Sequence, residues 1–318
     1  MKKSFIFAGA FVALTLAACS SQNDPVAPSV TIVNSTTETA ETGLLPGLFS
    51  IAPGHYVQFS KGNLQCSASS TGSKWRFADE QYGYWGFDNK ATSNNRDLYG
   101  FGQTGYGNTF MYSTTTFSTD NKYWGGYWQT SATSYGYGDI YYTNWDWGMY
   151  CTIENGGGHP GLWRTLQKEE WEYLLKTRPN AEYLHGYACV AEKFGYLILP
   201  DNFVLPAGLA FKYDATYWTD NEYCYQDWKK MEAAGAVFLP CTGCYDMSAS
   251  STFVYYPESC GYYWTSTVGT SSYGIAAHFG YIFKTDASTT SGTSLNTLKF
   301  RNVYKYYGCA VRLVREAI

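Results

Sequence analysis

The sequence predicts an α+β domain in which two helices pack on a mostly antiparallel sheet and long irregular loops join the elements. Two segments in the middle of the chain carry apolar residues at helical spacing. The C-terminal part alternates apolar and polar residues, as strands do. The composition changes abruptly at Leu44 and then stays uniform, which predicts a single domain over residues 44–318.

Two short alternating segments, residues 49–51 and 56–59, flank Pro53-Gly54. Because Pro followed by Gly is typical of a tight turn, these segments predict a β-hairpin at the start of the domain. We expect its second strand to pair with a strand near residues 311–314. That pairing would bring both ends of the domain together.

The first helix is expected over residues 167–176. Thr165 is a suitable N-cap, and Trp171, Leu174 and Leu175 share one face because they lie three and four residues apart. A face with these side chains should enter the core, so Trp171 is expected to be buried.

The second helix is expected over residues 225–234, with Trp228 and Met231 on its apolar face. Gly235 follows it and is suited to the left-handed conformation that ends many helices. The apolar run at residues 236–239 then predicts a short buried strand.

Three more strands are expected near the C-terminus, at residues 262–268, 274–283 and 306–314, with Gly/Ser/Thr-rich loops between them. By contrast, residues 75–160 are rich in Gly, Tyr, Trp and Asn and have no helical period. Large aromatic side chains at this density favour burial over disorder.

The N-terminus has the features of a lipoprotein signal peptide. Two lysines precede an uncharged apolar run that is too short to span a membrane. The run ends in Leu16-Ala-Ala-Cys19, a pattern in which the cysteine is lipidated and becomes the mature N-terminus. We therefore expect a signal peptide at residues 1–18, lipidation of Cys19 and a flexible tether at residues 19–43.

Such a leader predicts an outer-membrane lipoprotein of the cell envelope, attached to the membrane only through the lipid on Cys19. Display on the cell surface and retention on the periplasmic side are both compatible with it. The net charge is −4, so the chain has no basic excess that would favour nucleic acid as a partner.

The remaining cysteines are widely and irregularly spaced, which fits no small disulfide scaffold. Cys241-Thr-Gly-Cys244 resembles a zinc or redox half-motif. No second pair follows at zinc spacing, and the four histidines are scattered. A redox pair normally opens a helix, whereas this one follows Pro240 at the end of an expected strand. We therefore expect buried thiols or one local disulfide, and no metal or other cofactor.

Residues 163–173 resemble the helix-opening signature of formylglycine-generating-enzyme-like domains, which adopt a variant of the C-type-lectin fold. More closely, the chain resembles bacterial lipoproteins of the Fibrobacter succinogenes major paralogous domain type, in a lectin-like branch. Besides residues 231–240, the matching segments are Phe59-Ser-Lys-Gly-Asn-Leu64, Asp146-Trp-Gly148, Asn155-Gly-Gly157, Trp163-Arg-Thr165, Leu199-Pro-Asp201, Tyr263-Trp-Thr-Ser-Thr267 and Val311-Arg-Leu-Val-Arg315.

The resemblance implies a C-type-lectin-like fold and leaves function to the loops, because one fold can host many activities. Enzymes of the formylglycine-generating branch hold copper with a reactive cysteine pair near the C-terminus, whereas Cys260 and Cys309 are far apart in this sequence. A non-catalytic binding or adhesion module is therefore expected. The alternatives are an enzyme of the formylglycine-generating or glycan-processing type, or a purely structural envelope component.

The resemblance extends to variable proteins that are diversified by retroelements. Their changing residues would correspond to residues 265–278 and 302–309 here, and an undiversified paralogue is the alternative.

Aromatic residues are the main indication of a binding surface. The chain has 31 Tyr, 18 Phe and 11 Trp, and Tyr and Trp offer wide, stiff contact area at low entropic cost. Inward-facing residues of the C-terminal strands suffice for a core, so some aromatic rings there should face out and bind a glycan or protein ligand. The candidate contacts are Tyr263, Trp264, Tyr273, His278, Tyr304, Tyr306 and Tyr307.

Overall fold

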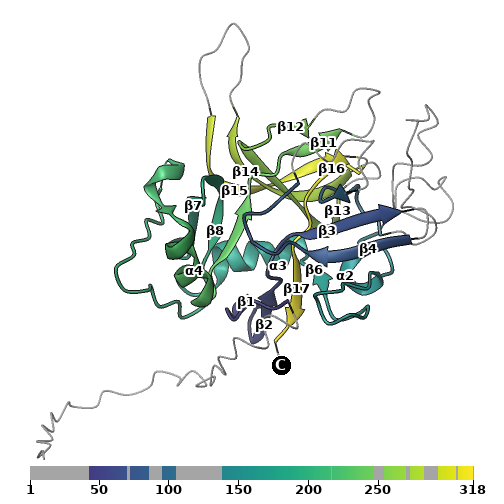
Figure 1. The fold of residues 1–318 in the computed structure, drawn as a ribbon, viewed down its shortest axis with the longest axis horizontal. Helices are drawn as coiled ribbons and strands as arrows, with labels where there is room; N and C mark the ends of the chain where they lie inside the picture. Colours follow the sequence, from purple (N-terminus) through teal and green to yellow (C-terminus); the bar gives the residue numbers. More distant parts are fainter. Residues whose placement is uncertain are drawn as a thin grey trace, which may run out of the picture. The chain divides into compact units, whose positions relative to one another are not determined.

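The computed structural model describes residues 43–69, 72–85, 95–104, 138–215, 217–246, 254–269, 273–282, 293–305 and 307–317. All of these fall in one compact unit, which spans Ser35–Ile318. The unit is a mixed α+β structure, mostly sheet with few helices, so the α+β prediction is confirmed (Figure 1). The expected signal peptide, Cys19 and nearly all of the expected tether lie outside the described residues.

One sheet joins the first and last strands of the domain. Its strands, in spatial order, are β1 (Phe49–Ala52), β2 (His55–Phe59), β17 (Leu313–Glu316) and β6 (Arg164–Thr165). β1 and β2 form the expected antiparallel hairpin, and Val314 of β17 lies opposite Phe59 of β2. The predicted pairing of the first and last strands is therefore confirmed.

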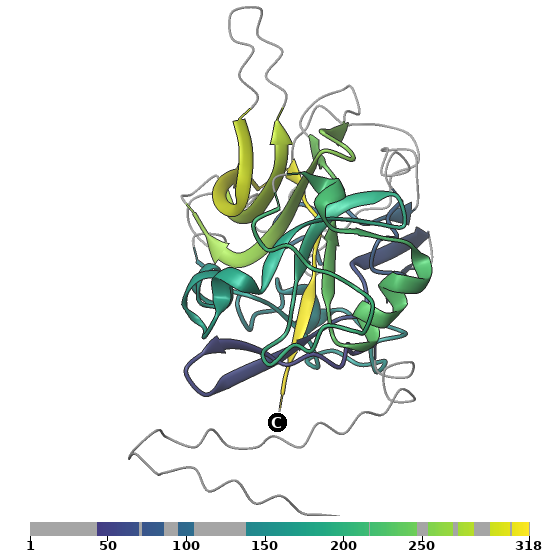
Figure 2. The same ribbon diagram turned by 90° about the vertical axis from the view of Figure 1, so that its left-hand side faces the viewer.

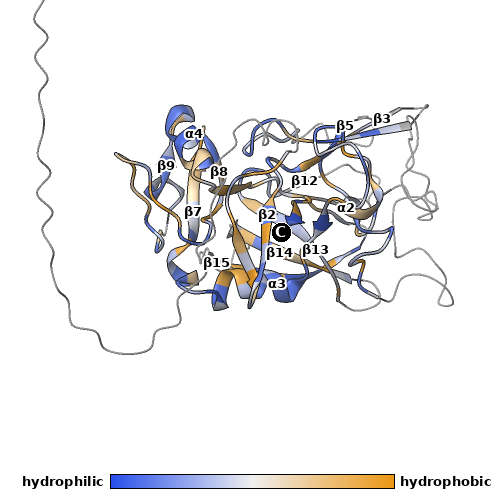
Figure 3. Ribbon diagram, turned by 90° about the horizontal axis from the view of Figure 1, so that it is seen from below, coloured by the Kyte–Doolittle hydropathy of each residue, from blue (hydrophilic) through white to orange (hydrophobic). Residues whose placement is uncertain are grey.

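A second sheet carries the longer helix, α4 (Tyr225–Ala233), on one face. Its strands, in spatial order, are β10 (Val237–Pro240), β8 (Lys193–Ile198), β7 (His185–Val190) and β9 (Glu222–Tyr223). Figure 3 colours α4 mostly hydrophilic, and its buried residues are Trp228 and Met231, as expected. Gly235 has φ +94°, so it ends the helix in the predicted way.

The third sheet contributes side chains to two core clusters, which take alternate residues of its strand β13 (Cys260–Val268). It consists of β13, β14 (Tyr273–Ile282) and β15 (Thr293–Tyr304), with β14 in the middle. Figures 1 and 2 both show β14 and β15 side by side. Tyr263 and Phe279 enter the core cluster that contains Trp171, whereas Tyr262 and Trp264 enter a second cluster.

Two small sheets and several short helices complete the described structure. The sheets are β4 (Gly72–Phe77), β3 (Leu64–Ser69) and β5 (Asn95–Arg96), and β12 (Val254–Tyr255), β11 (Cys244–Asp246) and β16 (Tyr307–Gly308). The short helices are α2 (Trp147–Tyr150), η5 (Ala181–Tyr183) and η6 (Trp218–Asp220). Within the described residues, no helix is long and apolar enough to cross a membrane.

The first expected helix is present, but its start differs from the prediction. α3 (Lys168–Glu172) continues as the π-helical turn η4 (Tyr173–Thr177), and its N-cap is Gln167. Thr165 is not the cap, because it lies in β6 and its hydroxyl donates to the carboxylate of Asp146 at 2.9 Å.

The expected strand at residues 306–314 was wrong as one continuous element. β16 and β17 are separate, because the backbone between them changes partner at each step. Cys309 bonds with Tyr99, the Ala310 N–H then donates to the Tyr262 carbonyl, and the Leu64 N–H donates to the Val311 carbonyl. This segment therefore forms hydrogen bonds with several segments in turn and does not extend one ladder.

Candidate functional site

Three tyrosines gather where β14 begins and β15 ends, and we call them the tyrosine cluster. Tyr273 and Tyr304 are directly opposite in the strand register, and their rings stack with centroids 4.5 Å apart and an interplanar angle of 29°. The Tyr307 ring lies 5.9 Å from that of Tyr304. Tyr304 is 38% exposed, and the other two are half-buried, so the cluster reaches the protein surface.

A polar side chain accompanies the tyrosine cluster along the same face of the sheet. Residues two apart in a strand face the same way, so Asn302 and Tyr304 share a face. Asn302 is exposed and lies opposite the half-buried Ile275. The surface thus combines stacked aromatic rings, an aliphatic side chain and an amide that can both donate and accept hydrogen bonds.

Lysine 305 lies between two members of the cluster in sequence but points into the protein. Its Nζ is 5.6 Å from the centroid of the Phe101 ring, and burial lowers its pKa to about 8. The exposed cationic residues of β15 are Lys299 and Arg301. Both lie an odd number of positions from Tyr304, so they belong to the opposite face of the strand. Neither of these cations therefore shares the face of the tyrosine cluster, whereas Asp246 of β11 lies directly opposite Tyr307.

Tyr263 and Trp264 are not surface contacts, because both side chains are buried. The Tyr263 hydroxyl donates to the Pro240 carbonyl at 2.9 Å, and the Trp264 Nε1–H donates to the Tyr99 carbonyl at 2.6 Å. The prediction assumed that one face of β13 was open to solvent. The two core clusters cover both faces, so neither ring can face out.

His278 is a third buried residue among the candidate contacts. In the part of the chain that the structure describes, neither of its ring nitrogens has a hydrogen-bond partner, and its ring lies 4.2 Å from that of Tyr262. Burial, with a smaller effect from Arg301 and Lys299, lowers its pKa to about 3. His278 is therefore a neutral core side chain, and its inclusion among the surface contacts is corrected. Tyr306 lies outside the described residues.

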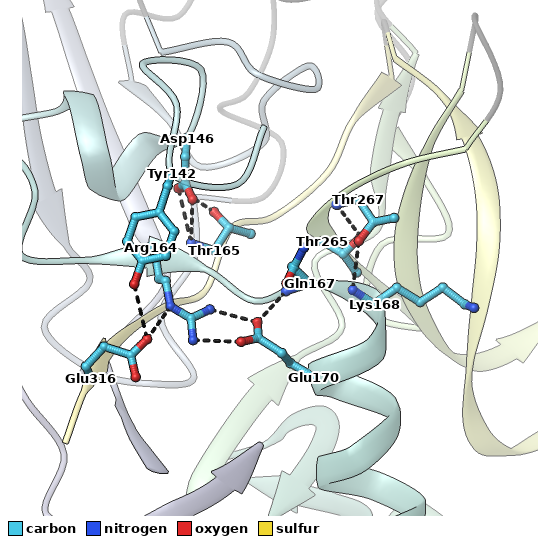
Figure 4. A network of polar contacts seen from close by, with 10 residues as sticks. All are labelled: Tyr142, Asp146, Arg164, Thr165, Gln167, Lys168, Glu170, Thr265, Thr267 and Glu316. Carbon is cyan, nitrogen blue, oxygen red and sulfur yellow. Dashed lines mark hydrogen bonds and ion pairs between the residues drawn. The ribbon is translucent and has the colours of Figure 1, made fainter. Parts of the chain in front are cut away.

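A polar network that the sequence did not predict surrounds Arg164 at the start of α3 (Figure 4). The Arg164 guanidinium donates to both carboxylate oxygens of Glu170, at 2.7 and 2.8 Å, and its Nε donates to Glu316 at 2.6 Å. The Tyr141 and Tyr142 rings lie over it at 5.2 and 5.9 Å. Arg164 is only 3% exposed, so this network joins β6, α3 and β17 and is not an open ligand site.

Asp146 lies beside this network and is fully buried. Its carboxylate accepts hydrogen bonds from the Thr165 N–H, the Thr165 hydroxyl and the Gly148 N–H. Burial outweighs these hydrogen bonds and raises the pKa of Asp146 to about 7. Asp146 and Thr165 both belong to segments that carried the family resemblance, but their spacing in sequence gave no sign that they are bonded.

Among the residues that the structure describes, no group of three or more His, Cys, Asp or Glu side chains could hold a metal ion. In comparisons with known proteins, no protein-family model, no curated protein and no solved structure matches the chain. The geometry of the tyrosine cluster is thus the main guide to function.

Proposed function

We propose that this protein is a lipid-anchored, non-catalytic binding or adhesion module of the cell envelope, and that the tyrosine cluster contacts its ligand. One observation carries the proposal: Tyr273, Tyr304 and Tyr307, from two sheets, meet in one partly exposed aromatic surface. Two of these rings come from strands that are already fixed by the core, so little side-chain entropy is lost when a ligand binds.

The chemistry of this surface favours a ligand with a flat apolar face and polar edges. Tyrosine rings can stack on the C–H face of a sugar or on apolar and aromatic protein side chains. The Asn302 amide beside them can bond to hydroxyl or backbone groups. Glycans and proteins are therefore the two ligand classes to test.

We further propose that the domain is C-type-lectin-like, in the variant that the resemblance implies. The pairing of β2 with β17 supports this, because a lectin-like fold closes by joining its first and last strands. The lipid on Cys19 would hold the domain at the outer membrane, on its cell-surface or periplasmic side.

The test is a triple variant, Tyr273→Ala/Tyr304→Ala/Tyr307→Ala, compared with the unaltered chain on a glycan array and in pull-downs from host and bacterial protein extracts. A ligand of the tyrosine cluster should bind the variant at least about tenfold more weakly. As a guide to the size of the effect, stacking of one nucleobase on one aromatic side chain is worth about 1–3 kcal/mol. The cross-strand pair contributes about 0.2–1 kcal/mol to folding, but Tyr307 also packs against a core cluster, so a thermal unfolding curve must first show that the variant is folded.

A matched control replaces three exposed tyrosines elsewhere, Tyr213, Tyr217 and Tyr225, which are 48%, 71% and 52% exposed. This control should bind as the unaltered chain does. If the control loses binding and the cluster variant keeps it, the ligand site lies outside the tyrosine cluster.

A further inference from the structure

Five of the described cysteines are buried in one core cluster: Cys66, Cys151, Cys244, Cys260 and Cys309. Three of them, Cys244, Cys260 and Cys309, carry thiols in the structure and pack in the part of this cluster that also holds Tyr262. They come from β11, β13 and the segment after β16, so segments far apart in sequence bring them together. Their mutual placement follows from the strand register.

The register places Cys244 directly opposite Cys309. β11 pairs antiparallel with β16, with Tyr245 opposite Gly308 and Asp246 opposite Tyr307. Continued by one residue, this register sets Cys244 against Cys309. The Cys309 backbone pairs on its other side with Tyr99, through hydrogen bonds of 2.9 and 3.0 Å. Cys309 is thus held in place by Tyr99 on the side away from β11.

Directly opposite residues of an antiparallel pair have Cα atoms about 4.5–5.5 Å apart and point to the same face. Disulfides join residues whose Cα atoms lie about 4.4–6.8 Å apart. A register continued by one residue beyond Gly308 would therefore bring the Cα atoms of Cys244 and Cys309 within this range, and rotation of the two side chains would be the remaining change.

Cys260 is a less favourable partner for Cys244. A parallel bridge sets Gly243 against Gly261, so the position beside Cys244 on β13 belongs to Tyr262. Cys260 is offset from that position by two residues along the strand. The direct register thus favours Cys309.

We propose that Cys244 and Cys309 form a disulfide in the mature protein. The two thiols lose two protons and two electrons as the sulfur–sulfur bond forms. The oxidant is a disulfide of the thiol–disulfide class, such as oxidised glutathione or an envelope oxidoreductase, which is reduced to two thiols. The bond ties β11 to the end of β16, two residues beyond Tyr307 of the tyrosine cluster.

The burial of Cys309 indicates when the bond forms. Burial, with a smaller effect from Cys244, raises the pKa of the Cys309 thiol well above its ordinary value. The thiolate is the reactive form, so the folded, reduced protein should react slowly. Oxidation therefore accompanies folding, before the segment after β16 closes over the core.

The test uses the full chain, unfolded and reduced, then refolded in a mixture of reduced and oxidised glutathione. This experiment does not depend on export or on ligand binding. The refolded protein is unfolded again without reductant, alkylated and digested, and its peptides are analysed by mass spectrometry. We expect a linked pair of peptides that contain Cys244 and Cys309, with alkylation of the exposed Cys224 as an internal control.

Two variants make the result specific. Cys309→Ala should leave Cys244 open to alkylation, and Cys260→Ala should leave the linked pair intact. Complete alkylation of both Cys244 and Cys309 in the refolded unaltered chain would overturn the proposal. So would a bond that joins Cys244 to Cys260.

Discussion

Arg312 is a buried cation that the fold accommodates through hydrogen bonds to neutral amide side chains. The Arg312 guanidinium donates to the side-chain oxygens of Asn63 at 3.2 Å and Gln81 at 2.5 Å. The Gln81 amide in turn donates to Glu232 at 3.1 Å. Gln81 therefore lies between the Arg312 guanidinium and the Glu232 carboxylate and bonds to both. Buried polar groups of this kind cost desolvation, and they favour one arrangement of the segments that they join. We interpret Arg312 as a residue that fixes where α4 meets the C-terminal segment.

Asp146→Asn should change how stability depends on pH. The folded-state pKa of Asp146 is about 7, above its ordinary value of 3.8, so folding favours the protonated acid. The stability from this group is fully present below about pH 4 and is lost as the pH rises towards 7, by up to about 1.4 kcal/mol per pH unit. The Asn variant should lack this loss.

Chemical denaturation at a series of pH values from 4 to 8 measures the effect. At pH 4 the Asn variant should be less stable by about 1–3 kcal/mol, because its amide presents an N–H to backbone donors. By pH 8 the gap should close and reverse, because the unaltered protein loses about 4 kcal/mol over this range and the variant does not. Parallel stability curves for the two proteins would contradict the raised pKa.

At the scale of elements, the spacing of apolar residues was sufficient to predict the helices and the first hairpin, but it did not predict β15. Trp171 and Trp228 recur at helical spacing, and both are buried. In β15, Leu298 and Val303 are both buried although they lie on opposite faces, and an irregularity in pairing near His278 shifts the register. A bulge of this kind breaks the period of two, so alternation fails as a signal.

Part of the candidate site could not be predicted from the sequence, for a related reason. Alternation along one strand shows which residues share a face, and it correctly grouped Tyr304 with the C-terminal surface. It does not show whether a second layer covers that face. Tyr263 and His278 are buried because layers from distant parts of the sequence pack on both sides of the third sheet.

Trp171→Ala tests the packing of α3. The ring is 1% exposed and lies 5.8 Å from the ring of Phe59, which joins α3 to β2. Its Nε1 has no hydrogen-bond partner among the described residues, so we expect a loss of packing. We expect destabilisation of about 3–5 kcal/mol in thermal or chemical unfolding. Trp218→Ala, at a half-buried ring in η6, should cost clearly less, and equal losses would show that α3 is not an anchor of the core.

At the scale of the whole molecule, attachment to the membrane is expected to depend on a single residue. Cells that express the chain and are fed a clickable fatty acid should label the unaltered protein. Cys19→Ser should abolish the label, because the acylated thiol is absent. Equal labelling of both proteins would contradict a lipid on Cys19. Protease treatment of intact cells then distinguishes the cell surface from the periplasmic side.

The pairing of β2 with β17 also has a consequence for how the chain reaches its native state. Phe59 and Val314 are neighbours in the sheet but come from opposite ends of the domain. Contacts between such distant parts of a chain require a large loop to close, which slows folding. Until β17 is available, β2 presents an unpaired edge, and unpaired edges invite association with other chains. A growing chain of this protein therefore depends on its last-made strand to protect its first, which makes synthesis the stage at which a chaperone would matter most.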